Sequence, residues 1–121
     1  MIAALERVSD IFVLHLEGEI GSREIRSLRQ LLHSLTDREW HHFVLNFQKV
    51  NHVDYRTLVD LVITDMGLQN ESGRLKLAAL NPYVKSIFRI AGTLDCCEWY
   101  DSVAEAILSF DHGINPLSCP C

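Results

Sequence analysis

The sequence has few of the features that mark a nucleic-acid-binding or a membrane-spanning protein. Its 121 residues include 11 lysines and arginines against 16 aspartates and glutamates, so the formal net charge is -5. No run of basic residues offers the positive stripe that neutralises phosphates, which argues against a nucleic-acid-binding function. No apolar run approaches the roughly 20 residues that a membrane-spanning helix needs, so we expect no membrane insertion.

From its first residues and its cysteine spacing we expect no signal peptide and no metal-binding or disulfide pattern. The first residues, MIAALERVSD, have no basic start, so we expect a cytoplasmic protein whose four cysteines are free thiols. Cys96–Cys97 are adjacent and Cys119–Cys121 form a C-x-C, whereas zinc sites use two C-x₂-C pairs. His41 and His42 would point to opposite sides of a strand. We therefore predict no metal site.

Enzyme motifs are missing as well. There is no P-loop, no G-x-G-x-x-G after a strand, no G-x-S-x-G and no H-E-x-x-H. His15 and Glu17 share a strand face and could serve as a base with its orienting group, but the pattern places no nucleophile beside them. We predict a non-enzymatic protein with no catalytic residue and no cofactor, and nothing in the residues points to nucleotide binding.

Hydrophobic periodicity predicts an alternation of strands and helices. Apolar residues recur at every second position in the predicted strands and at every third or fourth position in the predicted helices. The expected elements are strands 2–8 and 11–17, a helix over 22–37, a strand at 43–47, a helix over 55–70, a strand at 74–80, a helix over 82–91, a strand at 96–99 and a last helix from 103.

Several helix ends carry capping signals. Ser22 is a candidate cap for the first helix, and Asn81 followed by Pro82 marks the start of the third, which Gly92 closes. Ser102 and Glu105 have the spacing of a capping box, with an apolar helix face after them.

The element order ββαβαβαβα predicts an α/β fold with a mostly parallel central sheet and four helices. Strands that alternate with helices pair in parallel through right-handed crossovers, and the opening hairpin adds one antiparallel strand at an edge. The nearly continuous apolar run FVLNF at 43–47 is typical of a central strand covered on both faces. We expect one domain over residues 1–110 and a flexible tail over 111–121.

A polar tetrad in the stretch VDYRTLVDLV is the candidate site, because it lies where a strand hands over to an apolar helix. Backbone N–H groups at such a junction lack helical partners and favour negative charge. Asp54 either caps the helix alone or also belongs to a docking surface, and Tyr55 either contacts a partner or packs over the sheet edge. Arg56 either binds an acidic partner or is solvated. The candidate partner-binding residues are Asp54, Tyr55, Arg56, Thr57 and Leu58.

Three stretches share their order and spacing with a known family. They are Gly18-Glu19-Ile20 before the first helix, FVLNFQKVNHVD before a helix that carries Leu58, and LAALNPYVKSIFRIAG with Pro82, Val84, Phe88 and Gly92. Together they resemble the STAS domain of bacterial anti-sigma factor antagonists, over roughly residues 5–110.

This resemblance implies a regulatory role at the same junction. The family motif there reads Asp-Ser-Ser/Ala-Gly-Leu, and a partner that is both a kinase and an anti-sigma factor phosphorylates its first serine. Unphosphorylated antagonist captures that partner and frees the sigma factor. This chain keeps Asp54 and Leu58, has Tyr55 at the phosphoacceptor position and Arg56 next, and has Thr57 in place of the glycine. Thr57 and Tyr55 are the candidate phosphosites, and we expect no phosphate on either.

Three partner hypotheses follow. The first is a kinase-type anti-sigma factor that binds at the start of the 55–70 helix and so controls transcription. The second is the ATPase of a lipid-transporting ABC system, on which this chain would dock as an accessory subunit, because the apolar stripe of that helix is wider than one sheet contact requires. The third is a second copy of this chain, joined through a strand edge or a helix face.

Overall fold

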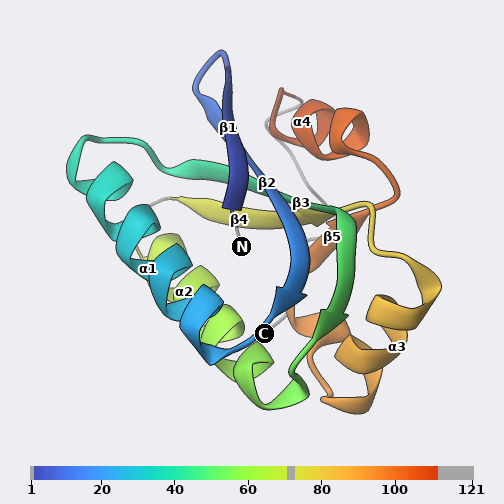
Figure 1. The fold of residues 1–121 in the computed structure, drawn as a ribbon. Helices are drawn as coiled ribbons and strands as arrows, with labels where there is room; N and C mark the ends of the chain where they lie inside the picture. Colours follow the sequence, from blue (N-terminus) through green and yellow to red (C-terminus); the bar gives the residue numbers. More distant parts are fainter. Residues whose placement is uncertain (1, 71–72, 112–121) are drawn as a thin grey trace.

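The computed structural model describes residues 2–70 and 73–111 (Figure 1). Its element order agrees with the predicted one. The elements are β1 (Ile2–Val8), β2 (Ile11–Ile20), α1 (Ser22–Asp37), β3 (His42–Val53), the 3₁₀ turn η1 (Tyr55–Thr57), α2 (Leu58–Gln69), β4 (Arg74–Ala78), α3 (Pro82–Ile90), the 3₁₀ turn η2 (Leu94–Cys96), β5 (Glu98–Tyr100) and α4 (Val103–Asp111).

The sheet confirms the predicted fold class. Its five strands lie in the order β1-β2-β3-β4-β5. β1 pairs with β2 in antiparallel fashion through the tight turn at Ser9 and Asp10, and the other neighbours are parallel. Parallel neighbours need long crossovers, which α1, α2 and α3 supply, whereas the hairpin strand can only lie beside its own partner.

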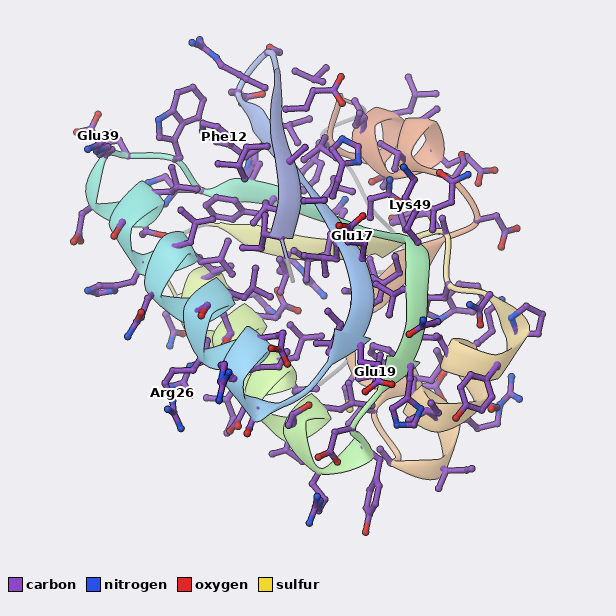
Figure 2. The ribbon with its side chains drawn as sticks, viewed as in Figure 1. Phe12, Glu17, Glu19, Arg26, Glu39 and Lys49 are labelled. Atoms are coloured by element: carbon purple, nitrogen blue, oxygen red, sulfur yellow. The ribbon has the colours of Figure 1, made fainter. Side chains whose placement is uncertain are left out.

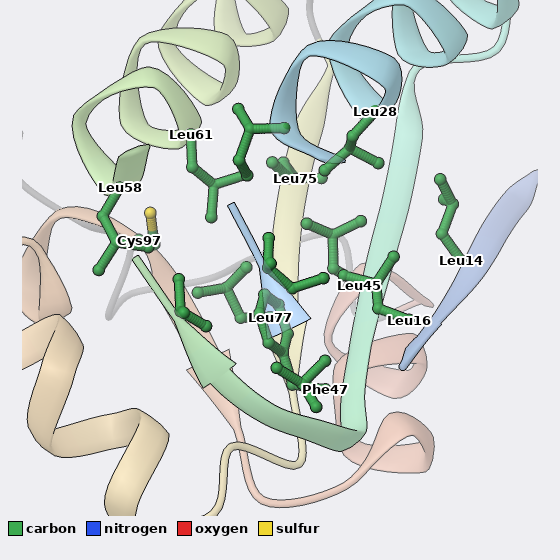
Figure 3. Packing of buried hydrophobic residues seen from close by; sticks show 14 of the residues in the cluster. Leu14, Leu16, Leu28, Leu45, Phe47, Leu58, Leu61, Leu75, Leu77 and Cys97 are labelled. Atoms are coloured by element: carbon green, nitrogen blue, oxygen red, sulfur yellow. The ribbon is translucent and has the colours of Figure 1, made fainter. Parts of the chain in front are cut away.

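Helices cover both faces of the sheet, in two separate apolar layers. The larger layer lies between the sheet and α1, α2 and α3, and Figure 3 shows Leu28 of α1 and Leu61 of α2 packed with strand residues such as Leu75. The smaller layer lies on the opposite face, where Val44 and its neighbours pack against Ala106 of α4. Because β3 is covered on both faces, its apolar run is almost continuous.

Two strands extend beyond their predicted ends. The strand predicted at 11–17 continues through Gly18, which has a φ of 77°, to Ile20, and the strand predicted at 43–47 spans His42–Val53. The apolar run underestimates β3 because Gln48, Lys49, Asn51 and His52 are exposed. The added parts of β2 and β3 pair with each other, which keeps their backbone in the sheet. An apolar run therefore marks the covered part of a strand, and backbone pairing determines its length.

Three predicted boundaries were wrong by one or two residues. The N-cap of α1 is Gly21 rather than Ser22, and the Gly21 amide donates to Glu24 Oε1 at 2.8 Å, which serves in place of a hydroxyl cap. β4 ends at Ala78 because Ala79 adopts a φ of 61°. β5 begins at Glu98, since η2 takes up the residues before it.

Other predicted ends are confirmed. Asn81 caps α3 by accepting a hydrogen bond from the Val84 amide at 2.7 Å, and Gly92 follows that helix with a φ of 73°. Ser102 caps α4 as predicted, since the Glu105 amide donates to Ser102 Oγ at 3.1 Å, and the Ser102 hydroxyl in turn donates to Glu105 Oε2 at 3.3 Å.

The cysteines and the tail divide between described and undescribed residues. Cys97 is buried, and Cys96 is a partly exposed free thiol, as predicted for that residue. α4 includes Asp111, the first residue of the predicted tail, and the rest of that predicted segment, with Cys119 and Cys121, lies outside the described residues. Each helix in the described part of the chain is too short or too polar to cross a membrane.

Candidate functional site

Asp54 lies at the junction between β3 and the α2 region, as the sequence predicts. Its amide donates to the Ile20 carbonyl at 2.9 Å, so the end of β2 fixes its backbone. Its Oδ1 accepts a hydrogen bond of 3.0 Å from the Arg56 amide, which caps η1. The first helical turn is therefore a 3₁₀ turn, and α2 itself begins at Leu58 rather than at Tyr55.

Arg56 binds Asp54 with its side chain as well. Its Nε donates to Oδ1 at 3.2 Å and its Nη2 to Oδ2 at 3.1 Å, a two-pronged contact between residues two apart in the chain. These hydrogen bonds, followed by the positive charge of Arg56, lower the pKa of the Asp54 carboxyl from its ordinary value. The sequence left Arg56 either solvated or bound to an acidic partner, whereas the structure gives it an acidic group of this chain.

The remaining candidates lie at different depths. The Tyr55 side chain is 57% exposed, whereas Thr57 is 4% and Leu58 0% exposed. Thr57 Oγ1 donates to the Asp54 carbonyl at 2.8 Å, and Leu58 belongs to the larger apolar layer (Figure 3). Asp54, Tyr55 and Arg56 thus form the surface of the candidate site, and the other two residues support it from below.

A hollow of about 650 Å³ lies beside Tyr55, and we call it the rim groove. Ile87 and the 79% exposed Ile90 of α3 give it an apolar side. Carboxylates from Glu19 and Glu24 give it an acidic side, and Figure 2 shows Glu19 near the ends of β2 and β3. Its lining residues are Glu19, Ile20, Gly21, Glu24, His52, Val53, Asp54, Tyr55, Arg56, Ile87 and Ile90.

The sequence did not predict the groove because its walls come from three segments far apart in the chain. The carboxyl ends of β2 and β3 and the last turn of α3 come together at the carboxyl end of the parallel strands. The end of a parallel sheet is where α/β proteins most often bind ligands and partners. One signal was available, since Ile90 is an apolar residue outside the buried stripe of its helix.

His15 has partners other than Glu17. Its Nε2 lies 2.9 Å from Glu6 Oε1 and its Nδ1 2.9 Å from Asn46 Nδ2, so the ring joins three neighbouring strands. Among residues 2–70 and 73–111, no three His, Cys, Asp or Glu side chains are grouped so as to hold a metal ion. His42 stacks on Phe110, with ring centroids 4.7 Å apart.

This α/β domain, with its polar junction after the central strand, matches one known family. The family model of the STAS domain matches residues 3–106, and the chain therefore belongs to the STAS family.

Solved structures with the same fold include regulatory proteins and part of a transporter. The Bacillus anti-sigma factor antagonist SpoIIAA, in its unphosphorylated form, is 23% identical over 93% of this chain and 97% of its own, with a TM-score of 0.73. An anti-sigma factor antagonist from Mycobacterium paratuberculosis is 19% identical over 88% and 90%, with a TM-score of 0.74. The murine Solute Carrier 26 family member A9 anion transporter is 14% identical over 90% of this chain and 19% of its own, with a TM-score of 0.72.

Proposed function

We propose that this chain is a non-enzymatic regulatory domain of the bacterial cytoplasm that acts as an anti-sigma factor antagonist. It binds a kinase-type anti-sigma factor at the surface formed by Asp54, Tyr55 and Arg56, and so controls transcription. The observation that carries the proposal is the exposure of Tyr55 beside the rim groove, at the junction where the family motif lies. Exposed aromatic side chains next to hollows are frequent interface anchors.

The charges of the site indicate the chemistry of the partner surface. Arg56 already neutralises Asp54, and Glu24 Oε1 accepts the hydrogen bond that caps α1. Glu19 adds a further carboxylate, next to the apolar surface of Ile87 and Ile90. A partner segment with an apolar side chain flanked by a lysine or arginine complements this arrangement.

The same geometry supports binding without the phosphorylation switch of the family. The Thr57 hydroxyl is buried and donates to the Asp54 carbonyl, so a kinase could reach it only after η1 opened. A tyrosine carries its hydroxyl far from the backbone, where a serine kinase does not hold it. We therefore propose constitutive binding, or control by another signal.

Binding of the purified kinase-type anti-sigma factor from the same organism tests the proposal. Tyr55→Ala and Ile90→Glu should each weaken binding about tenfold, a loss of about 1.4 kcal/mol. Leu108→Glu, at an exposed apolar residue of α4, is the matched control and should bind like the wild type. Variants at 55 and 90 that keep the wild-type circular dichroism and bind undiminished would refute the site.

A second candidate function rests on a different surface. Val59, Ile63 and Met66 form an exposed apolar stripe on α2, each about half exposed. The stripe favours a subunit that docks on the ATPase of a lipid-transporting ABC system. If such an ATPase copurifies with the chain, no kinase-type partner does, and Ile63→Glu removes the ATPase, the second function replaces the first.

A further inference from the structure

A second hollow of about 550 Å³ lies between α1 and α2, and we call it the α1–α2 groove. It shares no lining residue with the rim groove, and it opens beside the later turns of α2. Its lining residues are Arg26, Arg29, Gln30, Leu32, His33, Thr36, Ile63, Thr64, Gly67 and Leu68.

The α1 side of this groove is basic. Arg26 and Arg29 are exposed and three residues apart, so they are neighbours on one helix face, and Figure 2 shows Arg26 directed outward from α1. His33 lies one turn further along, with its Nε2 3.8 Å from Asp37 Oδ2. None of the described residues that line the groove is acidic, in a chain whose net charge is -5. The groove is therefore a local positive region on an acidic protein.

The α2 side is apolar and open. Ile63 is 53% exposed, and it continues the stripe that Val59 and Met66 form on the same helix. Leu32 and Leu68, which are buried, line the groove between the two helices. A contiguous apolar surface next to basic residues is typical of a contact site for another protein.

Gly67 keeps the middle of this surface free of side-chain atoms. It lies inside α2, where glycine makes a helix less stable than alanine does. A Cβ at this position would meet nothing within 4 Å among the described residues, so no contact there requires its absence. A partner segment that packs its backbone closely against α2 would require a residue without a Cβ at this position.

From these three features we infer that the α1–α2 groove binds an acidic amphipathic helix of a partner protein. The apolar face of that helix packs on Ile63 and over Gly67, and its carboxylates pair with Arg26 and Arg29. An anionic membrane is the other partner that basic and apolar residues attract, but a flat bilayer does not enter a groove between two helices. The inference concerns a surface separate from the rim groove and does not depend on binding of an anti-sigma factor there, although it shares Ile63 with the stripe of the second candidate function.

A synthetic helical peptide tests the inference with the full chain. The probe has about five turns, with leucines at i, i+3 or i+4 and i+7 and glutamates on both flanks, and a matched peptide carries lysines in place of the glutamates. The glutamate peptide should shift the amide resonances of Arg29, Ile63 and Gly67, and the lysine peptide should not. Arg26→Glu with Arg29→Glu should weaken binding at least about tenfold, whereas Arg89→Glu, an exposed arginine of α3, should leave it unchanged.

Gly67 provides a test that leaves the charges intact. Gly67→Gln should fold, because its side chain starts in open space. It should weaken peptide binding about tenfold, and the affinity of Gly67→Ala should lie between that of Gly67→Gln and that of the wild type. Tyr55→Ala should leave peptide binding unchanged, which separates this surface from the rim groove. Failure of the glutamate peptide to shift the groove resonances overturns the inference. A second outcome also overturns it. In that outcome the chain binds vesicles of phosphatidylserine and phosphatidylcholine but not the peptide, and the double variant Arg26→Glu with Arg29→Glu no longer binds the vesicles.

Discussion

The guanidinium of Arg56 and the carboxylate of Asp54 lie in contact, joined by hydrogen bonds of 3.2 and 3.1 Å, and the same carboxylate also accepts the Arg56 amide. One acidic side chain therefore starts the turn and also neutralises the arginine beside it. Neither charge is left for a distant ion pair within the described chain. Tyr55, between them in sequence, is 57% exposed.

This contact predicts how the contribution of Asp54 to stability changes with pH. The hydrogen bonds from Arg56 hold the pKa of folded Asp54 below its ordinary value of 3.8. A carboxyl with a lowered pKa stabilises the folded state above the unfolded pKa, and that contribution is lost as the pH falls through the folded pKa. Urea unfolding should therefore find Asp54→Asn less stable than the wild type at pH 7, with the difference shrinking below pH 3.8.

A matched control for this prediction is Asp101→Asn, at an exposed carboxylate before α4. It should show a smaller difference at pH 7. An Asp54→Asn variant whose deficit stays constant from neutral to acidic pH would show that the ion pair does not form in solution.

Two glycines should respond in opposite directions to alanine. Gly92 has a φ of 73°, which an L side chain adopts only with strain, so Gly92→Ala should lower the free energy of unfolding by about 1 kcal/mol. Gly67 has helical geometry and open space around a Cβ, so Gly67→Ala should raise it by about 0.5–1 kcal/mol. Chemical denaturation of both variants measures the difference. A loss at Gly67 would mean that its space is needed inside the folded chain, which would also remove the reason to assign that space to a partner.

A buried ion network predicts a larger loss. Lys76 Nζ lies 3.6 Å from Glu98 Oε1, donates to Ser109 Oγ at 2.7 Å and lies 4.0 Å from the centre of the Phe110 ring. It therefore links β4 and β5 to α4. Lys76→Ala leaves the buried Glu98 with less compensation, and we expect a loss of about 3 kcal/mol or more. Hydrogen exchange in α4 should accelerate.

Replacement by a side chain of similar volume separates charge from packing at this position. Lys76→Met should recover part of the loss, because an apolar chain packs on Phe110, whereas Lys49→Ala at an exposed position of β3 should cost little. If α4 exchanges no faster in Lys76→Ala than in the wild type, the lysine does not hold that helix on the sheet.

The sequence predicted the element order and the polar junction but not the rim groove, and the reason is physical. Caps such as Asn81 and Ser102 act within four residues, so their meaning can be read locally. The rim groove depends on how strand and helix ends come together, and this makes Glu19 and Ile90 line one hollow although the two are far apart in the chain. The burial of Thr57 could not be predicted from the sequence either. The sequence pattern indicated an α-helical turn there, whereas the chain forms a 3₁₀ turn in which Thr57 is buried.

The last prediction concerns the phosphoacceptor position of the family. Tyr55→Ser places a seryl hydroxyl close to the backbone, next to Asp54, where family members carry the serine that is phosphorylated. Incubated with ATP and the kinase-type anti-sigma factor, this variant should gain one phosphoryl group by intact mass, and the wild type none. The added charge of about -1.5 to -2 beside the Asp54 carboxylate should then release the partner.

The comparison needs a variant that removes the phenol without adding a hydroxyl, and Tyr55→Ala serves that purpose. It should remain unmodified, so that any phosphate on the serine variant can be assigned to position 55. Phosphate on the wild-type chain would contradict constitutive binding, and peptide mapping would then decide between Tyr55 and Thr57. Modification of Thr57 would also require η1 to open, because the Thr57 hydroxyl donates to the Asp54 carbonyl and is buried in the closed turn.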